Sequence, residues 1–279
     1  MNASRRSPIR IAVLALVGSL ATMFLVVALA FAGGSHVASD NGSAGNPRIL
    51  PPGSSPYGVS YAEWDARWWL WAFSIPADPS NPFFPGGNVL QGQTGSVWFL
   101  TGVFGGEVRS ISIPSGTSLY FPIVNTECST AEPDPFHGGN EAELRACAKG
   151  WIDNSFDLAA EIDGTPVQNI WSYRHQSTLY SFGPLGPNNI LGVPGASGQS
   201  ADDGVYLMVA PMSVGSHTIH ITGNLGGVGV IDTEYDIQVV PAGSASAGSV
   251  SPGVAEPLSG ATNPVNANST WGRVKSVYR

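Results

Sequence analysis

The longest hydrophobic stretch of the chain lies at its beginning. Residues 11–32 are uncharged and mainly apolar, with three arginines before them and Gly33-Gly34-Ser35 after them. This layout is typical of an export signal, and Ala30-Phe31-Ala32 resembles a cleavage site. Because 22 such residues also suffice to span a bilayer, residues 1–32 are predicted to be a signal peptide or a signal anchor. Both readings predict a secreted or cell-surface protein, which would contact the membrane only through an uncleaved leader.

Two segments show the period of a helix. Between Ser60 and Phe73, tryptophans recur one turn apart along one stripe, and Ser60 with Glu63 forms a capping box. Asn140 and Glu143 form a similar box at the start of a second helical segment. The sequence therefore predicts two helices, of which the first is rich in tryptophan.

Most other segments show the patterns of short strands. The last of them, Val230–Val240, alternates apolar and polar residues, as a half-buried strand does. Asp163-Gly164 lies between two strand-like segments and predicts a hairpin. Two further hairpins are expected, one joining Ser96–Ile113 to Ser118–Val124 and one joining Gly204–Ala210 to Ser216–Thr222.

This succession of hairpins predicts the fold class. Strands do not alternate with helices along the chain, so a parallel α/β fold is not expected. We predict a mainly β protein: an antiparallel, jelly-roll-like β-sandwich with two flanking helices. The domain is expected at residues 57–241, preceded by a flexible linker at 33–56 and followed by a disordered tail at 242–279, because both flanks are rich in small and polar residues.

Charge limits the partners of this domain. Between Tyr57 and Val240 the chain holds 18 acidic residues and five basic ones. A surface this negative repels phosphate backbones, so nucleic acid is not an expected partner. Neutral extracellular polymers, including polysaccharides, remain compatible with it.

The chain has two cysteines, Cys128 and Cys147. An even number in an exported protein predicts a disulfide. Closing a loop of this length stabilises a fold by roughly 3 kcal/mol on the chain-entropy model. Two buried free thiols are the alternative.

Acidic residues gather in and beside the stretch bounded by these cysteines. A tethered loop of carboxylates could hold calcium, which binds six to eight oxygens, and the candidate ligands are Glu127, Glu132, Asp134 and Glu141. Their spacing matches no calcium motif, so a solvated acidic loop followed by a helix start is the favoured interpretation.

The tryptophan-rich helix supports two interpretations. Indole faces stack on sugar rings, so Trp64, Trp68 and Trp69 could form a binding platform, with Trp69 the one expected to be exposed. The same spacing is what a helix docked on a sheet shows, and a core role is the favoured interpretation.

A second candidate for ligand contact is the pair Asp202 and Asp203, which ends the unpatterned stretch Gly183–Asp203. With a partner such as Glu127, these carboxylates could provide acid and base for glycoside hydrolysis. An Asp-Gly turn entering a strand is the simpler interpretation.

Several short motifs together resemble a family of uncharacterised exported bacterial proteins. The resemblance covers about Tyr57 to Thr222, and the tryptophan-rich helix is its most specific part; the motifs are Tyr57-Gly58, Tyr61, Glu63-Trp64, Trp68-Trp69, Gly92-Gln93, Val97-Trp98-Phe99-Leu100, Phe104-Gly105-Gly106, Phe121-Pro122-Ile123, Asp203-Gly204 and Gly215-x-His217. It implies bacterial export and one domain. No activity is established for that family, so it assigns no functional residue.

Common catalytic signatures are absent from the sequence. It contains no Gly-x-Ser-x-Gly elbow, no His-Glu-x-x-His and no phosphate-binding loop. We therefore expect a non-catalytic exported module that is structural or binds a cell-surface or extracellular polysaccharide. A secreted carbohydrate-active hydrolase that uses a carboxylate pair is the alternative.

Overall fold

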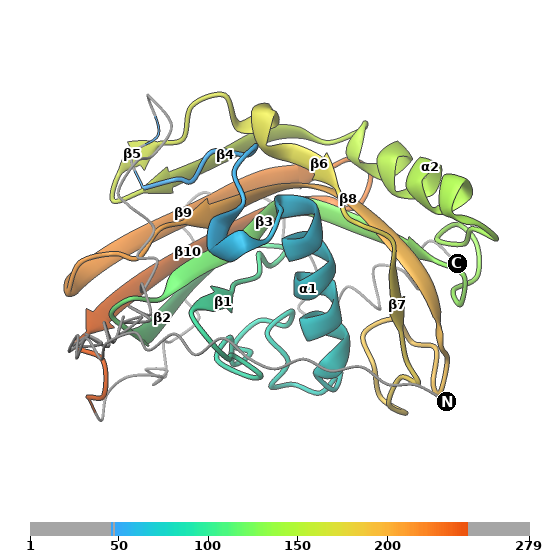
Figure 1. Ribbon diagram of the computed structural model, residues 1–279, viewed down its shortest axis with the longest axis horizontal. Coiled ribbons are helices and arrows are strands. Elements are labelled where there is room, and N and C mark those ends of the chain that lie inside the picture. The colour runs from blue at the N-terminus through green and yellow to red at the C-terminus, as the bar shows by residue number, and fades with distance from the viewer. Residues whose placement is uncertain (1–45, 47, 245–279) are drawn as a thin grey trace, which may run out of the picture. The chain divides into compact units, whose positions relative to one another are not determined.

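The computed structural model describes residue 46 and residues 48–244 (Figure 1). The leader, most of the predicted linker and the tail beyond residue 244 lie outside the described residues. The described part is mainly β, with two sheets of five strands each, and its sandwich-like arrangement agrees with the predicted fold class. No helix among the described residues has both the length and the apolar character needed to cross a bilayer.

The first sheet is built around two long strands. β3 and β8 run antiparallel at its centre, and the sheet contains β1 (Val97–Phe99), β3 (Ser118–Ser129), β8 (Gly198–Val209), β6 (Arg174–Gln176) and β7 (Tyr180–Phe182). Both β6 and β7 pair with β8, and β1 is parallel to β3. β8 is buried on both faces from Ser200 onward, as expected for a central strand covered on both sides.

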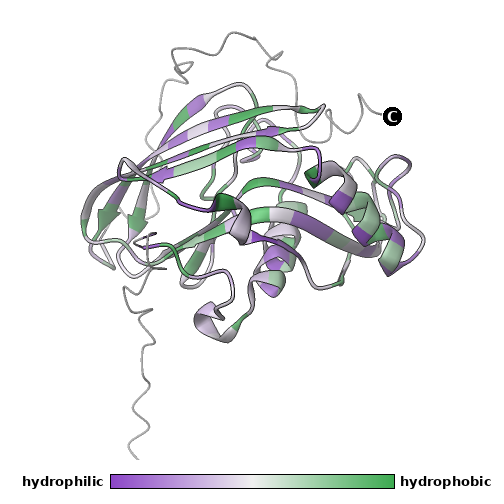
Figure 2. Ribbon diagram, turned by 90° about the horizontal axis from the view of Figure 1, so that it is seen from above, coloured by the Kyte–Doolittle hydropathy of each residue, from purple (hydrophilic) through white to green (hydrophobic). Residues whose placement is uncertain are grey.

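The second sheet has the order β2 (Glu107–Pro114), β10 (Gly229–Val240), β9 (Gly215–Leu225), β4 (Phe156–Ile162) and β5 (Thr165–Pro166). Its β2 and β10 are parallel, while the other pairs are antiparallel. Along β10, the predicted alternation is confirmed: Ile231, Tyr235, Ile237 and Val239 are buried, while Asp232, Glu234, Asp236 and Gln238 keep exposed surface. Figure 2 shows hydrophobic and hydrophilic residues alternating along several strands. Each sheet thus contains one parallel pair that the antiparallel prediction did not include.

Two of the three predicted hairpins are wrong. β2 and β3 lie in different sheets, and so do β8 and β9, because the chain crosses between the layers at both connections. The hairpin at Asp163-Gly164 is confirmed: β4 pairs with β5, and the two turn residues have φ of 50° and 72°. Positive φ at both positions is what a tight two-residue turn requires.

Both predicted helices are present and capped as expected. α1 (Tyr61–Ser74) begins where the Glu63 N–H donates to Ser60 Oγ at 3.3 Å. α2 (Glu141–Ile152) begins where the Glu143 N–H donates to Asn140 Oδ1 at 3.1 Å. Two short 3-10 helices, η1 (Pro56–Gly58) and η2 (Ile170–Tyr173), complete the set of helices in the described part.

The two helices pack on opposite faces of the first sheet. Cys128 and Ala201, on β3 and β8, share a small buried cluster with side chains of α2. Their neighbours in sequence, Glu127 and Asp202, point to the other face because side chains alternate along a strand. That second face is the one covered by α1.

The packed body begins before Tyr57. Ile49 and Leu50 are buried in the main core, and the Leu50 N–H donates to the Met208 carbonyl at 2.9 Å. The last residues of the predicted linker are therefore part of the fold rather than a free connection.

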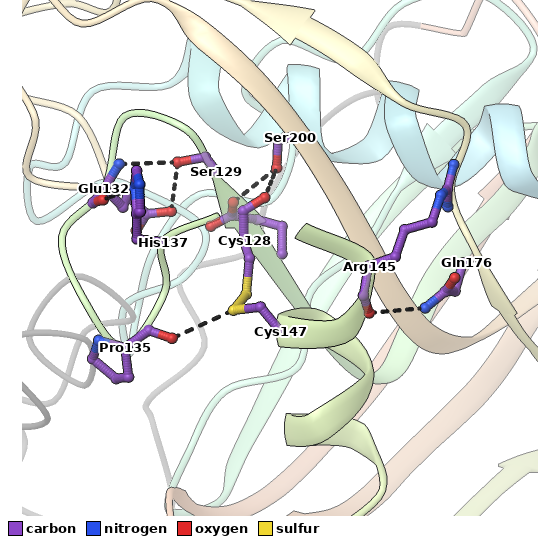
Figure 3. The surroundings of a disulfide bond; sticks show 10 residues. Cys128, Ser129, Glu132, Pro135, His137, Arg145, Cys147, Gln176 and Ser200 are labelled. Carbon is purple, nitrogen blue, oxygen red and sulfur yellow. Dashed lines mark hydrogen bonds between the residues drawn. A yellow bond between two sulfur atoms is a disulfide. The ribbon is translucent and has the colours of Figure 1, made fainter. Parts of the chain in front are cut away.

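The predicted disulfide is present between Cys128 on β3 and Cys147 on α2 (Figure 3). It closes a loop in which the His137 ring bonds the Glu132 carbonyl at 2.8 Å. The bond fixes the middle of α2 against β3, on the sheet face opposite the buried carboxylates described below.

Candidate functional site

A cluster of buried carboxylates lies between α1 and the first sheet. Asp65 of α1, Glu127 of β3 and Asp202 of β8 each have no exposed surface (0%), and we call them the buried carboxylate cluster. An ionised carboxylate in such a place is costly unless it is hydrogen-bonded or paired. The partners of these three groups therefore decide what the cluster can do.

Asp65 is held by two aromatic residues of the sheet. The Tyr120 hydroxyl donates to its Oδ1, and His175 Nδ1 lies 2.7 Å from its Oδ2. The ring of His175 is stacked on Tyr206, with centroids 5.9 Å apart, and Tyr206 is stacked on Tyr120 at 5.4 Å. The three parallel rings keep the acceptor and both donors in a fixed arrangement.

Asp202 and Glu127 are directly opposite each other on neighbouring strands. Side chains in such a pair start about 5 Å apart. The Tyr206 hydroxyl donates to Asp202 at 2.9 Å, and Ser200 Oγ donates to Glu127 at 2.9 Å. Gly204 makes this possible, because a Cβ there would lie 2.5 Å from the Tyr206 ring.

Burial is the largest influence on the pKa values of the two aspartates, Asp202 and Asp65. It raises the pKa of Asp202 well above the usual range, and the nearby Asp65 carboxylate raises it further. Burial also raises the pKa of Asp65, although the charge of His175 acts in the opposite direction. Asp202 and Asp65 therefore retain protons at pH values at which exposed aspartates have lost them.

This protonation predicts a pH-dependent stability. Because the pKa of Asp202 is higher in the folded than in the unfolded chain, its contribution is fully present below the unfolded value, near pH 4, and is lost as pH rises through the folded value. We expect Asp202→Asn, which keeps an acceptor for Tyr206, to weaken the decline in stability between about pH 5 and about pH 8. Urea unfolding across this range measures it. Asp236→Asn, on the exposed face of β10, serves as the control, and an unchanged decline in Asp202→Asn would contradict the assignment.

Asp202 and Asp203, which the sequence predicts to act as a pair, lie on opposite faces of the first sheet. Asp203 points to the face opposite Asp202, where Arg174 donates to it from Nε at 2.8 Å and Gln176 from Nε2 at 3.1 Å. Both aspartates lie inside β8 rather than at the end of a loop, because the strand already begins at Gly198. The turn interpretation is therefore wrong, and the pairing of Asp202 with Glu127 is the part of the hypothesis that the geometry supports.

The four predicted calcium ligands do not converge. Glu132 is buried and accepts from Ser129 Oγ at 3.0 Å (Figure 3). Glu127 accepts from Ser200 Oγ, and Glu141 accepts from Arg145. Asp134 is exposed on the loop. Within residues 48–244, no three His, Cys, Asp or Glu side chains are grouped as a metal site. The geometry thus gives the calcium hypothesis no support.

The predicted tryptophan platform is not exposed. Trp68 and Trp69 are each only 1% exposed, so the expectation that Trp69 faces solvent is wrong. Trp68 Nε1 donates to the Leu100 carbonyl at 2.9 Å, and its ring packs against those of Trp69 and Phe83. These two indoles belong to the core, as the favoured interpretation predicted.

A groove runs along the outer flank of α1 and has a volume of about 600 Å³. We call it the α1 groove. Its aromatic part consists of Tyr57, Trp64, Trp71 and Phe99, and its polar rim includes Arg67, Ser74, Thr94 and Ser96. Trp64 and Trp71 are 7% and 6% exposed, and their rings lie 6.3 and 5.5 Å from that of Phe99. Aromatic surface beside hydroxyl groups is the composition expected of a site for a polar ring-shaped ligand.

Hydrogen bonds hold the two tryptophan rings at the base of this groove in place. Trp64 Nε1 donates to the Pro56 carbonyl and Trp71 Nε1 to the Gln91 carbonyl, at 3.2 and 2.8 Å. Gly92 has a φ of 67°, and a Cβ there would lie 3.2 Å from the Trp71 ring. The rings are thus held in place before any ligand arrives, which reduces the entropic cost of binding.

A second groove of about 550 Å³ lies on the outer face of β2, β9 and β10. Its lining combines hydroxyl groups with Asp163, His217 and Asp236, and it contains no aromatic ring of Tyr, Trp or Phe. It lacks the apolar floor of the α1 groove, so we regard the α1 groove as the candidate binding site.

Part of these sites can be predicted from the sequence. Asp65 cannot, because it lies between tryptophans on a helix, where one acidic residue gives no signal of burial. Phe99 and Thr94 follow a segment without periodicity, and only the fold brings them beside α1. The sequence does predict Trp64 as a ligand contact, but it groups Trp64 with Trp68 and Trp69, which are buried in the core.

Comparisons with known proteins assign neither a family nor a function. No protein-family model and no curated protein sequence matches the chain. Among solved structures, a cysteine protease inhibitor of Entamoeba histolytica is similar over 52% of this chain and 96% of its own, with 10% identity and a TM-score of 0.21. A likeness of that extent carries no argument about fold or activity.

Proposed function

We propose that this protein is an exported, non-catalytic module that binds a cell-surface or extracellular polysaccharide in the α1 groove. The observation that carries the proposal is the pre-formed aromatic floor of the groove, flanked by hydroxyl groups. Flat apolar rings contact the C–H faces of sugars, while rim hydroxyls replace hydrogen bonds with water. The apolar leader and the disulfide between Cys128 and Cys147 support export.

One observation favours the alternative, a hydrolase with a carboxylate pair. Glu127 and Asp202 lie opposite each other in the register of β3 and β8, which is close enough for acid and base to cooperate. Their complete burial argues against it, because a glycosidic bond must reach both groups. Binding in the α1 groove requires no such access.

Filling the α1 groove tests the proposal. We expect Thr94→Trp, an exposed position on the rim, to weaken binding of a polysaccharide from a broad panel by at least about tenfold, since roughly 1.4 kcal/mol of contact would be lost. Calorimetric titration measures the affinity. Thr165→Trp, at an exposed position of β5, is the matched control and should bind like the unaltered protein.

Two outcomes would contradict the proposal. In the first, no panel member binds; in the second, both tryptophan variants bind as well as the unaltered protein. Release of reducing ends that disappears in both Asp202→Asn and Glu127→Gln would favour the hydrolase instead.

A further inference from the structure

The α1 groove contains one charged side chain, Arg67, in a domain dominated by carboxylates. Its guanidinium carbon lies 5.0 Å from the centroid of the Trp64 ring, a cation–π arrangement that holds the side chain against the aromatic floor. Both Arg67 and its partner Glu63 are about half exposed, at 45% and 43%. The guanidinium is thus held in a defined position and is still accessible to a ligand.

One edge of this guanidinium is occupied and the other is open. Arg67 Nε donates to Glu63 Oε1 at 3.3 Å, and Glu63 is held from its other oxygen by Thr178 Oγ1 at 3.2 Å. Neither terminal nitrogen of Arg67 has a hydrogen-bond partner among the described residues. This leaves two parallel donors that match the spacing of a carboxylate.

The other arginines of the domain are different. Within Tyr57–Val240, all of which the structure describes, Arg109, Arg145 and Arg174 use terminal nitrogens for internal bonds. Arg67 is the arginine there whose terminal nitrogens are left for a ligand. It is also the one that lies beside an aromatic groove.

We propose that the α1 groove selects glycans that carry an acidic sugar, with the carboxylate on the terminal nitrogens of Arg67 and the sugar ring over the aromatic floor. This inference rests on the proposed function and names its ligand class. A sugar with one carboxylate suits the site better than a polyanion, because the domain contains 18 acidic residues and the groove offers one open guanidinium. Arg67 is thereby a specificity-determining residue.

Matched sugars test this directly. The probes are three pairs of trisaccharides of the gluco, galacto and manno series, each pair differing only in whether its terminal unit is a hexose or the corresponding uronic acid. We expect the acidic member of at least one pair to bind about tenfold or more tightly than the neutral one, as a bidentate charged contact provides. Arg67→Gln should abolish that preference, so that the two members of the pair bind within about threefold of each other.

Arg145→Gln is the matched control, since Arg145 also pairs with an acid one turn earlier but lies on α2. It should keep the preference. Equal affinity for both members of every pair, with binding still blocked by Thr94→Trp, would overturn the acidic-sugar inference and leave the proposed function standing. Absence of binding to all six probes would overturn the acidic-sugar inference, and absence of binding to the polysaccharide panel as well would overturn the proposed function. A preference that survives Arg67→Gln would overturn the role of Arg67.

Discussion

We expect Trp68→Ala to lower the free energy of unfolding by about 3–5 kcal/mol, a large part of the 5–15 kcal/mol typical of a domain. Trp68 is at the centre of the aromatic packing between α1 and its surroundings, with the rings of Trp69, Phe83 and Tyr206 at 5.0, 5.4 and 6.2 Å. Removing the indole leaves a cavity and leaves the Leu100 carbonyl without its donor. Urea unfolding monitored by circular dichroism measures the change.

An exposed tryptophan provides the control for this variant. Trp171 is 43% exposed on η2, so Trp171→Ala should change stability by no more than about 0.5 kcal/mol. Trp68→Phe, which keeps most of the ring volume but loses the N–H, should fall between the two. If Trp68→Ala cost no more than Trp171→Ala, the burial described for the helix would be wrong.

The second large effect concerns a buried ion pair. Arg109 and Glu107 of β2 are 5% and 4% exposed, and their closest atoms are 3.0 Å apart. Arg109 also donates to the carbonyls of Pro82 and Phe84, and Glu107 accepts from the Gly86 N–H. The pair therefore fastens the long segment between α1 and β1 to the second sheet.

We expect Arg109→Met to destabilise the protein by about 3–5 kcal/mol, because it leaves the Glu107 carboxylate buried without its cation. Chemical unfolding at neutral pH measures this. The double variant Glu107→Leu with Arg109→Met should recover part of the loss, since no unpaired charge remains. The exposed pair of Arg67 with Glu63 is the control, and Arg67→Met should cost less than about 1 kcal/mol. Equal costs for the two methionine variants would contradict this account.

The sequence predicted the elements whose signals are local. Ser60 and Asn140 mark both helix starts by a capping residue and an acid three positions later, and β10 alternates over its whole length. Asp163-Gly164 has the backbone freedom that its turn needs. These features depend on neighbours in the chain, so they can be predicted without knowledge of the fold.

The pairing of strands could not be predicted in the same way. β2 pairs with β10 across more than a hundred residues, although β3 follows it after a short turn. A strand pattern shows which face is buried, but not which other strand lies beside it. The predicted hairpins failed for this reason.

The candidate site was predicted in part. The proposal of Glu127 as a partner of Asp202 agrees with their opposed positions, but the start of β8 is polar and was interpreted as the end of a loop. Polar residues are tolerated there because each has a partner: Tyr206 donates to Asp202, Arg174 donates to Asp203, and Ser200 donates to Glu127. The tryptophan-rich helix α1 is covered on one side by the first sheet and on another by the segment before β1. The spacing of its tryptophans therefore could not predict which indole rings keep some exposure.

The location of the binding site is tested most directly by the indole N–H signals of the ¹⁵N-labelled protein during titration with the glycan of highest affinity. The account predicts that the signals of Trp64 and Trp71 shift in proportion to saturation, whereas those of Trp151 and Trp171, which lie outside the α1 groove, stay in place. Saturable binding that moves the signals of Trp151 or Trp171 and leaves those of Trp64 and Trp71 unchanged would contradict it.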